Sequence, residues 1–375
     1  MRAHHLVTFP RMLHPGAWWL WALGLAAAAS RTRNPVPLLL ILAVTGFVVA
    51  ARRSDAPWAR SYGAFLKLAL LVIAIRVVFQ ALLSTGSQGP TLLFTLPEIP
   101  MPGASGLKLG GEVTLEAVLR AFYEGLQLAT ILVCVGAANA LGSARRLLRS
   151  VPGALYEVGV AVVIALTFAP QLVTDASRIR AAHRLRGQSG GLRAMRRLAM
   201  PVLEGALDRS VELAAAMDSR GYGRTTRVSP RERHVTGLLV LGGLLGLSVG
   251  VFGLLSGTDA GWLGMPTLVG GTVLAAAGLY LGGRRTGRTR YRPDPWALPE
   301  WLVAGSGLLA AAAMLVEVAM DPSTLVLASV TAVPPVPVLA VLGILAAVLP
   351  AILAPPLPAP AREETTRDDE MEVAA

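Results

Sequence analysis

Long apolar stretches separated by short polar segments make up most of this 375-residue chain. A helix needs about 20 apolar residues to cross a bilayer, and several stretches approach or exceed that length. In chain order the stretches are Gly16–Ser30, Val36–Ala51, Tyr62–Ser84, Leu115–Leu141, Val151–Ala169, Val235–Ser256, Trp262–Gly283, Trp301–Met320 and Thr324–Leu353. The pattern predicts an all-α, polytopic membrane protein with about eight membrane helices and a cytosolic helical part.

The first two stretches are each shorter than a full membrane span. The polar residues 31–33 and the pair Asn34-Pro35 separate them, and a proline at this place must interrupt a helix. We therefore expect a short helical hairpin. The basic start and the alanines at 26–29 also resemble a signal peptide, but the membrane segments that follow favour a membrane hairpin.

Positive charges predict the orientation of the helices, because arginines concentrate in cytosolic loops. Arginines occur at 52–60 and again at 145–149, whereas the Gly/Pro-rich loop Thr85–Thr114 between them holds one lysine and two glutamates. This loop should face the outside, and both termini should face the cytosol. Arg31 and Arg33 are exceptions, because this topology places them outside.

Most of the net charge of +11 lies between Ser143 and Arg233. This segment holds 16 arginines and 7 acidic residues, a balance of +9. A basic run in a membrane protein indicates a cytosolic segment. Nucleic-acid binding is disfavoured, because only Tyr156, Phe168 and Tyr222 supply aromatic rings within the segment.

Two helices are expected inside this basic segment. Arginines flank Val151–Ala169 on both sides, so this stretch should lie along the inner face of the membrane, or dip in and return. We expect Pro170 to kink the chain and to start a helix over roughly Gln171–Arg186. Apolar positions at helical spacing predict a second helix over roughly Leu192–Arg220.

Each of these helices ends in an Arg-Gly pair, Arg186-Gly187 and Arg220-Gly221. Glycine is a common helix terminator, so each arginine should lie in the last turn, at the negative end of the helix dipole. Two arginines presented outward from rigid ends suit docking into acidic grooves on a partner. An ordinary charge at a helix end is the alternative interpretation.

The stretch Ala216-Met217-Asp218-Ser219-Arg220-Gly221-Tyr222 resembles the second signature motif of the CbiQ/EcfT-like proteins, the T components of energy-coupling factor (ECF) transporters. The Asn34-Pro35 pair resembles the family as well, and the likeness extends over roughly residues 14–290. Leu185 and Ser219 stand where the family usually has alanine. The resemblance implies that each Arg-Gly motif engages one of two ATP-binding subunits.

The same resemblance implies a mechanical role. The chain would transmit ATPase motion to a substrate-binding membrane S subunit, for uptake of a vitamin or a transition metal such as cobalt or nickel. The alternatives are a permease subunit of another ABC transporter class, or a membrane scaffold whose basic segment binds anionic lipid. Recovery of different partner proteins on purification would separate the three.

The sequence offers little for catalysis. Neither of the two lysines, Lys67 and Lys108, follows the glycine-rich loop of an ATPase. Cys134 is the single cysteine and the five histidines are scattered, so no metal site and no cofactor are expected. We expect a non-catalytic subunit of an ATP-driven transporter.

Two further patterns concern the membrane helices. Glycines recur every four residues at Gly242, Gly246 and Gly250, and again at Gly278 and Gly282, which favours close helix packing or a docking face for a membrane partner. Arg76 and Glu124 lie inside neighbouring spans, where an unpaired charge is costly, so we expect a structural ion pair between them.

These patterns divide the chain into five expected parts. They are N-terminal membrane helices (1–141), cytosolic coupling helices (142–233), membrane helices that complete the family core (234–295), an additional C-terminal membrane helix pair (296–355) and a disordered acidic tail (356–375).

Overall fold

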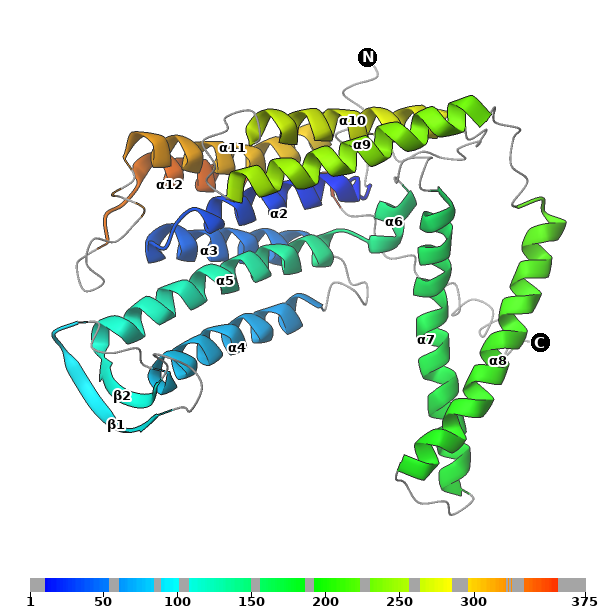
Figure 1. The fold of residues 1–375 in the computed structure, drawn as a ribbon, viewed down its shortest axis with the longest axis horizontal. Helices are drawn as coiled ribbons and strands as arrows, with labels where there is room; N and C mark the ends of the chain where they lie inside the picture. The colour runs from blue at the N-terminus through cyan, green and yellow to red at the C-terminus, as the bar shows by residue number, and fades with distance from the viewer. Residues whose placement is uncertain are drawn as a thin grey trace, which may run out of the picture. The chain divides into compact units, whose positions relative to one another are not determined.

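The computed structural model is almost entirely helical, with one two-stranded ribbon among the residues it describes (Figure 1). The described residues are 11–53, 61–83, 89–100, 108–149, 156–185, 192–222, 230–255, 264–284, 296–321, 323, 325 and 334–356. Within them, 7 helices are long and apolar enough to cross a membrane. The expected fold class, an all-α polytopic membrane protein, is confirmed.

Two compact units make up the chain, one from residues 1–147 and 294–375 and the other from 148–293. The first unit begins with a hairpin of α2 (Pro15–Ser30) and α3 (Pro35–Arg52). Asn34 Oδ1 accepts a hydrogen bond from the Val36 amide at 3.0 Å, and Pro35 occupies the first helical position, where no amide hydrogen is needed. The Asn34-Pro35 pair therefore both ends the preceding turn and starts α3.

Next come α4 (Ser61–Leu82) and α5 (Leu115–Leu141), which lie side by side (Figure 1). The connection between them is not the irregular loop that we expected. It contains an antiparallel ribbon of β1 (Leu92–Pro100) and β2 (Lys108–Thr114). Gly110 and Gly111 have φ angles of 88° and 111°, which let the ribbon bend, and Thr114 Oγ1 caps α5. Glycine is uncommon in strands, so the sequence pattern at Gly110 and Gly111 did not predict β2.

The first unit is completed by α11 (Leu298–Met320), α12 (Val338–Ala346) and α13 (Pro350–Leu353). Of the expected span over Thr324–Leu353, the continuously described part from residue 334 contains two short helices rather than one. Pro337 precedes α12, and Pro350 follows a tight turn at 347–349. Proline supplies no amide hydrogen, so it starts a new helix more readily than it continues one.

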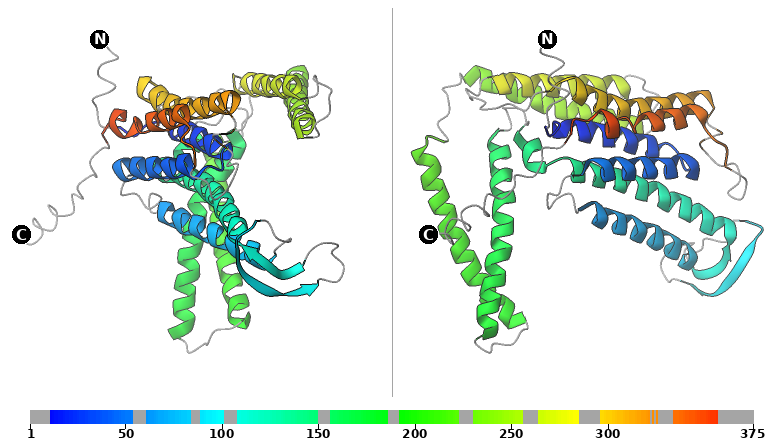
Figure 2. Two further views of the ribbon diagram at one scale, coloured as in Figure 1. Left: turned by 90° about the vertical axis from the view of Figure 1, so that its left-hand side faces the viewer. Right: turned by 180° about the vertical axis from the view of Figure 1, so that it is seen from behind.

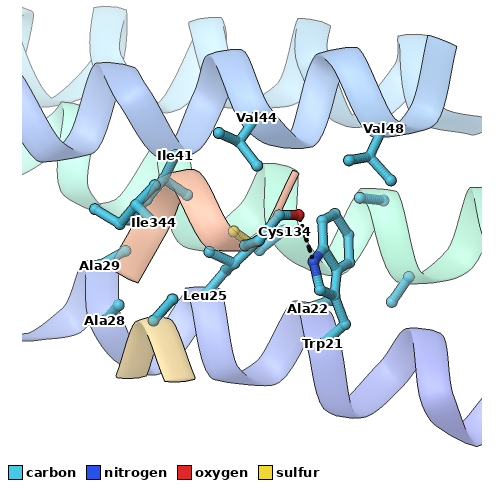
Figure 3. Packing of buried hydrophobic residues seen from close by; sticks show 14 of the residues in the cluster. Trp21, Ala22, Leu25, Ala28, Ala29, Ile41, Val44, Val48, Cys134 and Ile344 are labelled. Carbon is cyan, nitrogen blue, oxygen red and sulfur yellow. Dashed lines mark hydrogen bonds between the residues drawn. The ribbon is translucent and has the colours of Figure 1, made fainter. Parts of the chain in front are cut away.

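A shared apolar core joins the C-terminal helices to the N-terminal hairpin. Trp21 and Leu25 of α2, Ile41 of α3 and Ile344 of α12 are all fully buried in it (Figure 3). The indole nitrogen of Trp21 donates to the Ala347 carbonyl at 3.0 Å, which satisfies the one polar atom of this side chain (Figure 3).

Glycines set the closest approach in this core. A Cβ on Gly24 of α2 would lie 2.3 Å from the Gly307 carbonyl oxygen of α11, so the two backbones touch. Small residues of this kind allow membrane helices to pack closely.

Polar contacts link the same segments. Asn34 Nδ2 donates to the Pro335 carbonyl at 2.6 Å, and Thr32 Oγ1 donates to the Leu325 carbonyl at 3.2 Å. Arg52 Nε and Nη2 both donate to the Ala351 carbonyl, at 2.9 and 2.7 Å. The bonds from Asn34 and Arg52 satisfy carbonyl oxygens without a helical partner, because Pro335 precedes α12 and the residue four positions after Ala351 is Pro355, which has no amide hydrogen.

The second unit contains α7 (Tyr156–Leu185), α8 (Leu192–Ser219), α9 (Pro230–Leu255) and α10 (Met265–Arg284), and the short α6 (Ala144–Arg149) leads toward it. Two helical pairs are seen from several sides in Figure 2, α7 with α8 and α9 with α10. The helix start that we expected after Pro170 is wrong, because α7 continues through this residue and includes most of the preceding apolar stretch. A helix tolerates one missing amide hydrogen when the flanking turns remain bonded.

Candidate functional site

The end of α8 has the geometry of a Schellman motif, a glycine-terminated helix end. The Tyr222 amide donates to the Met217 carbonyl at 3.0 Å, and the Gly221 amide donates to the Asp218 carbonyl at 2.9 Å. Gly221 has a φ of 75°, a left-handed conformation that glycine adopts without strain. The helix therefore stops at a defined place because residue 221 is glycine.

Arg220 is the capping residue of this motif and is exposed, as is the ring of Tyr222, at 47%. The carbonyl groups that end α8 carry the negative pole of the helix dipole, which stabilises a cation at this position. The guanidinium is thus held on a rigid helix end without an intramolecular ion pair among the described residues. Such a group is available to a carboxylate on another protein.

The first Arg-Gly pair, Arg186-Gly187, lies outside the described residues. The helix that leads to it, α7, ends at Leu185, and this side chain is 90% exposed.

One ion pair joins α7 to α8. Arg209 Nη1 lies 2.5 Å from Asp175 Oδ2, and the two side chains are 34% and 25% exposed. The face of α8 that is turned away from this pair carries Met200, Leu203, Leu207 and Val211, which are 57–71% exposed. Their spacing of three or four residues places them in one stripe. α8 is therefore amphipathic with one apolar stripe left uncovered by the described residues.

The structure brings Arg76 of α4 and Glu124 of α5 into contact, Arg76 Nη2 against Glu124 Oε2. Gly125 makes this possible, because a Cβ there would lie 3.2 Å from the Ile73 Cα, so that the two helices approach closely. A second arginine reaches the same carboxylate. Arg33 Nη1 lies 3.7 Å from Glu124 Oε1, a partner that the sequence pattern did not suggest.

Three of the five glycines that the sequence pattern singled out in α9 and α10 pack against the opposite helix. Cβ atoms on Gly246, Gly250 and Gly278 would lie 2.5–2.9 Å from atoms of the partner helix. Gly242 does not, because no described atom lies within 4 Å of its added Cβ, and the neighbouring Gly243 makes the contact instead. Gly282 is half-buried near the end of α10.

Glu300 is a buried charge that sequence reasoning missed. Its side chain is 0% exposed, lies 3.0 Å from Arg11 Nη2, and accepts a hydrogen bond from the Ala297 amide at 3.0 Å. The position, third in a helix that begins Leu298-Pro299, is where a carboxylate reaches back to the helix start. That placement was the available signal.

In the part of the chain that the structure describes, no three His, Cys, Asp or Glu side chains cluster in a way that could hold a metal ion. The arrangement offers helix ends, an uncovered apolar stripe and tightly packed membrane helices, which are means of contact with other molecules.

The sequence model of the CbiQ family, described as a cobalt transport protein, matches residues 7–230. This chain belongs to the CbiQ family. The match covers α2 to α8 and stops at the first residue of α9, so α9 to α13 lie beyond it.

Two curated relatives are each named energy-coupling factor transporter transmembrane protein EcfT. The protein from Leuconostoc gelidum subsp. gasicomitatum is 28% identical over 194 residues, which is 47% of this chain and 66% of the relative. The protein from Limosilactobacillus fermentum is 26% identical over 201 residues, 51% of this chain and 71% of the relative. The expected CbiQ/EcfT-like membership is thereby confirmed.

Proposed function

We propose that this CbiQ-family chain is the T subunit of an ECF-type importer. In this role it couples the motion of two ATP-binding subunits to a substrate-binding membrane S subunit. The observation that carries the proposal is the end of α8, where a family-like motif forms a rigid glycine-terminated end with an exposed Arg220.

The proposed mechanism is mechanical. When the ATPases close on ATP, they carry the docked ends of α7 and α8 with them, and the helices reorient the S subunit. Arginine suits such a contact, because it stays charged and forms paired hydrogen bonds to a carboxylate. By the same proposal, Arg186-Gly187 engages the second ATPase.

We propose a vitamin or a transition-metal ion as the substrate, with cobalt or nickel as candidates. The description of the CbiQ family names cobalt transport, which supports a metal ion. In this architecture the S subunit selects the substrate.

We also propose that both termini face the cytosol. The basic segment that contains α7 and α8 favours this orientation, and it places the α2–α3 turn outside. The ion pair between Arg33 and Glu124 lowers the cost of an outward-facing arginine at this turn.

Co-purification of the full chain from its host tests the proposal. We expect two ATP-binding subunits and a small, very hydrophobic membrane protein in stoichiometric amounts, and the double variant Arg186→Glu, Arg220→Glu should release both ATPases. Arg178→Glu is the matched control, since Arg178 is exposed on α7 away from either glycine.

Other outcomes would favour other classes. ATPases recovered with a periplasmic binding protein would indicate another class of ABC permease, and recovery of neither partner would indicate a scaffold. The purified chain alone should show no ATP hydrolysis, since its lysines lack a phosphate-binding loop. Hydrolysis that point mutations in this chain abolish would overturn the coupling role.

A further inference from the structure

One end of the first unit carries more positive charge than its single paired carboxylate can balance. Glu124 Oε1 lies 3.7 Å from Arg33, and Glu124 Oε2 contacts Arg76. Two guanidinium groups therefore share one carboxylate. One arginine paired with one glutamate would be neutral, whereas Arg33, Arg76 and Glu124 together keep a net charge of +1.

Two more arginines border this group. Arg31 caps the end of α2, and Arg120 lies one turn before Glu124 on α5; both are exposed. Among the described residues neither forms an ion pair. The nearby carboxylate of Glu116 accepts a hydrogen bond from the Thr91 amide and lies against Gly89, at the ribbon. We call Arg31, Arg33, Arg76, Arg120 and Glu124 the arginine cluster; its net charge is +3.

The arginines of the cluster still have donors to offer. The side chains of Arg33 and Arg76 are 59% and 49% exposed after pairing, whereas Glu124 is 19% exposed. A guanidinium has five N–H donors and two oxygens of one carboxylate cannot satisfy ten. The unsatisfied donors face the surroundings of the helices.

The cluster lies near a membrane interface. Arg76 is 15 residues from the start of α4 and Glu124 is 17 residues from the end of α5. At 1.5 Å per residue, both are about 22–26 Å from the opposite end of the bundle. A hydrocarbon core of about 30 Å then places the guanidiniums within reach of the headgroups on this side.

Apolar surface adjoins the cluster on the side of the bilayer centre. On α5, Leu128 follows Glu124 by one turn and is 51% exposed, and Ile131 and Val135 continue the same face half-buried. On α4, Ile75 and Leu68 are 47% and 44% exposed. A cationic end above an apolar strip complements an anionic head with acyl chains.

We propose that the arginine cluster binds the phosphodiester headgroup of an anionic diacyl phospholipid. The phosphate oxygens would accept from the guanidinium donors that Glu124 leaves unused, and the acyl chains would lie along the apolar strip. This site is separate from the helix ends that carry the proposed coupling, and it does not depend on the transported substrate.

The first test measures lipid binding to the purified full chain in detergent, by native mass spectrometry and by thermal shift. Dioleoylphosphatidylglycerol is the probe, and dioleoylphosphatidylcholine and inorganic phosphate are the comparisons. The triple variant Arg31→Gln, Arg33→Gln, Arg120→Gln keeps the Arg76–Glu124 pair and should bind the anionic lipid at least about tenfold more weakly. The matched control removes three exposed arginines of α7, at positions 178, 180 and 184.

Equal losses in the triple variant and its control would overturn the proposal. Stabilisation by inorganic phosphate as strong as that by the lipid would overturn the lipid assignment, since no acyl chain would then be needed. Unchanged lipid binding together with loss of a membrane partner protein would show that the cluster serves a protein contact instead.

A second variant separates lipid binding from structural support. Glu124→Gln removes the competing carboxylate, so the purified chain should bind the anionic lipid more tightly than the wild type, although its melting temperature without lipid should fall. A structural role alone predicts weaker or unchanged lipid binding in this variant, and that result would contradict the proposal.

Discussion

The helix bundle of the first unit and the α7–α8 pair of the second differ in how much of their apolar surface is buried within the chain. In α3, α5 and α11, 39% of the most apolar segment is buried within the chain, against 6% in α7; α4, at the edge of the bundle, is also 6% buried. The helices α3, α5 and α11 of the bundle therefore pack against other parts of the chain, whereas most of α7 does not. This difference separates a part that is fixed by internal packing from a part whose contacts are left for other molecules.

Polar groups follow the same division. In the bundle, side chains bond to backbone about 300 residues away in the sequence, as Asn34 does to Pro335 and Arg52 to Ala351. Among the described residues, α7 and α8 are joined by a partly exposed ion pair between Arg209 and Asp175. Hydrogen bonds between residues far apart in the sequence fix the helices of the bundle relative to one another. Over the part of the chain that the structure describes, the α7–α8 pair has fewer such bonds, so it can move together with a bound partner.

The largest contrast is expected for a bulky residue at a glycine. Gly24→Leu would drive its side chain into the Gly307 backbone, so the loss of stability should reach or exceed the upper end of the roughly 1–3 kcal/mol that overpacking usually costs. Thermal unfolding in detergent measures it. Gly205→Leu on α8, where the nearest atom is 3.8 Å from the added Cβ, should be tolerated.

Gly305→Leu is the control within the bundle, because no described atom lies within 4 Å of its added Cβ. If Gly24→Leu and Gly305→Leu unfolded at the same temperature, the close approach of α2 and α11 would be wrong.

The next contrast concerns two carboxylates. Glu300→Ala leaves Arg11 without its partner at a site where the carboxylate is fully buried, and should cost about 3 kcal/mol. Asp175→Ala breaks a partly exposed pair on α7 and α8 and should cost about 0–1 kcal/mol. Chemical or thermal unfolding measures the loss of stability in both variants. Equal losses would contradict the distinction between the two regions.

A smaller effect is expected at the intramembrane pair. Glu124→Gln leaves two arginines without a carboxylate and should cost less than the roughly 2.5–3.5 kcal/mol of an unpaired charge at the bilayer centre, because solvent and headgroups reach the cluster. The exchange Arg76→Glu with Glu124→Arg should restore part of the melting temperature. Adding Arg33→Gln should restore more, because the exchange places Arg33 beside a new arginine. An exchange variant no more stable than either single variant would contradict the pairing.

Sequence reasoning predicted the parts of this molecule that follow from local rules. Helix α5 has the bounds expected from its apolar run, and Asn34-Pro35 interrupts the chain because its residues cap and start a helix. The Arg76–Glu124 contact was predictable from equal depth in neighbouring spans. The end of α8 was predictable to one residue because Gly221 fixes it.

Other features depended on contacts that no local rule reveals. The helical course through Pro170 was missed, because proline lowers helix stability without forbidding a helix whose other bonds are intact. Arg33 had no assigned partner, because Glu124 is 91 residues away in the sequence. The register of α9 against α10 placed Gly243, not Gly242, in the contact, a choice set by helix crossing rather than by glycine spacing.

The proposed coupling role is tested most directly by a variant that should change transport and leave the fold intact. Arg220 is exposed at the end of α8, so Arg220→Glu should leave the melting temperature of the chain nearly unchanged. ATP-driven uptake should nevertheless be lost when the variant is reconstituted in vesicles with its ATPases and S subunit, whereas Arg178→Glu should transport normally. Normal uptake by Arg220→Glu, with the ATPases bound as in the wild type, would contradict the account.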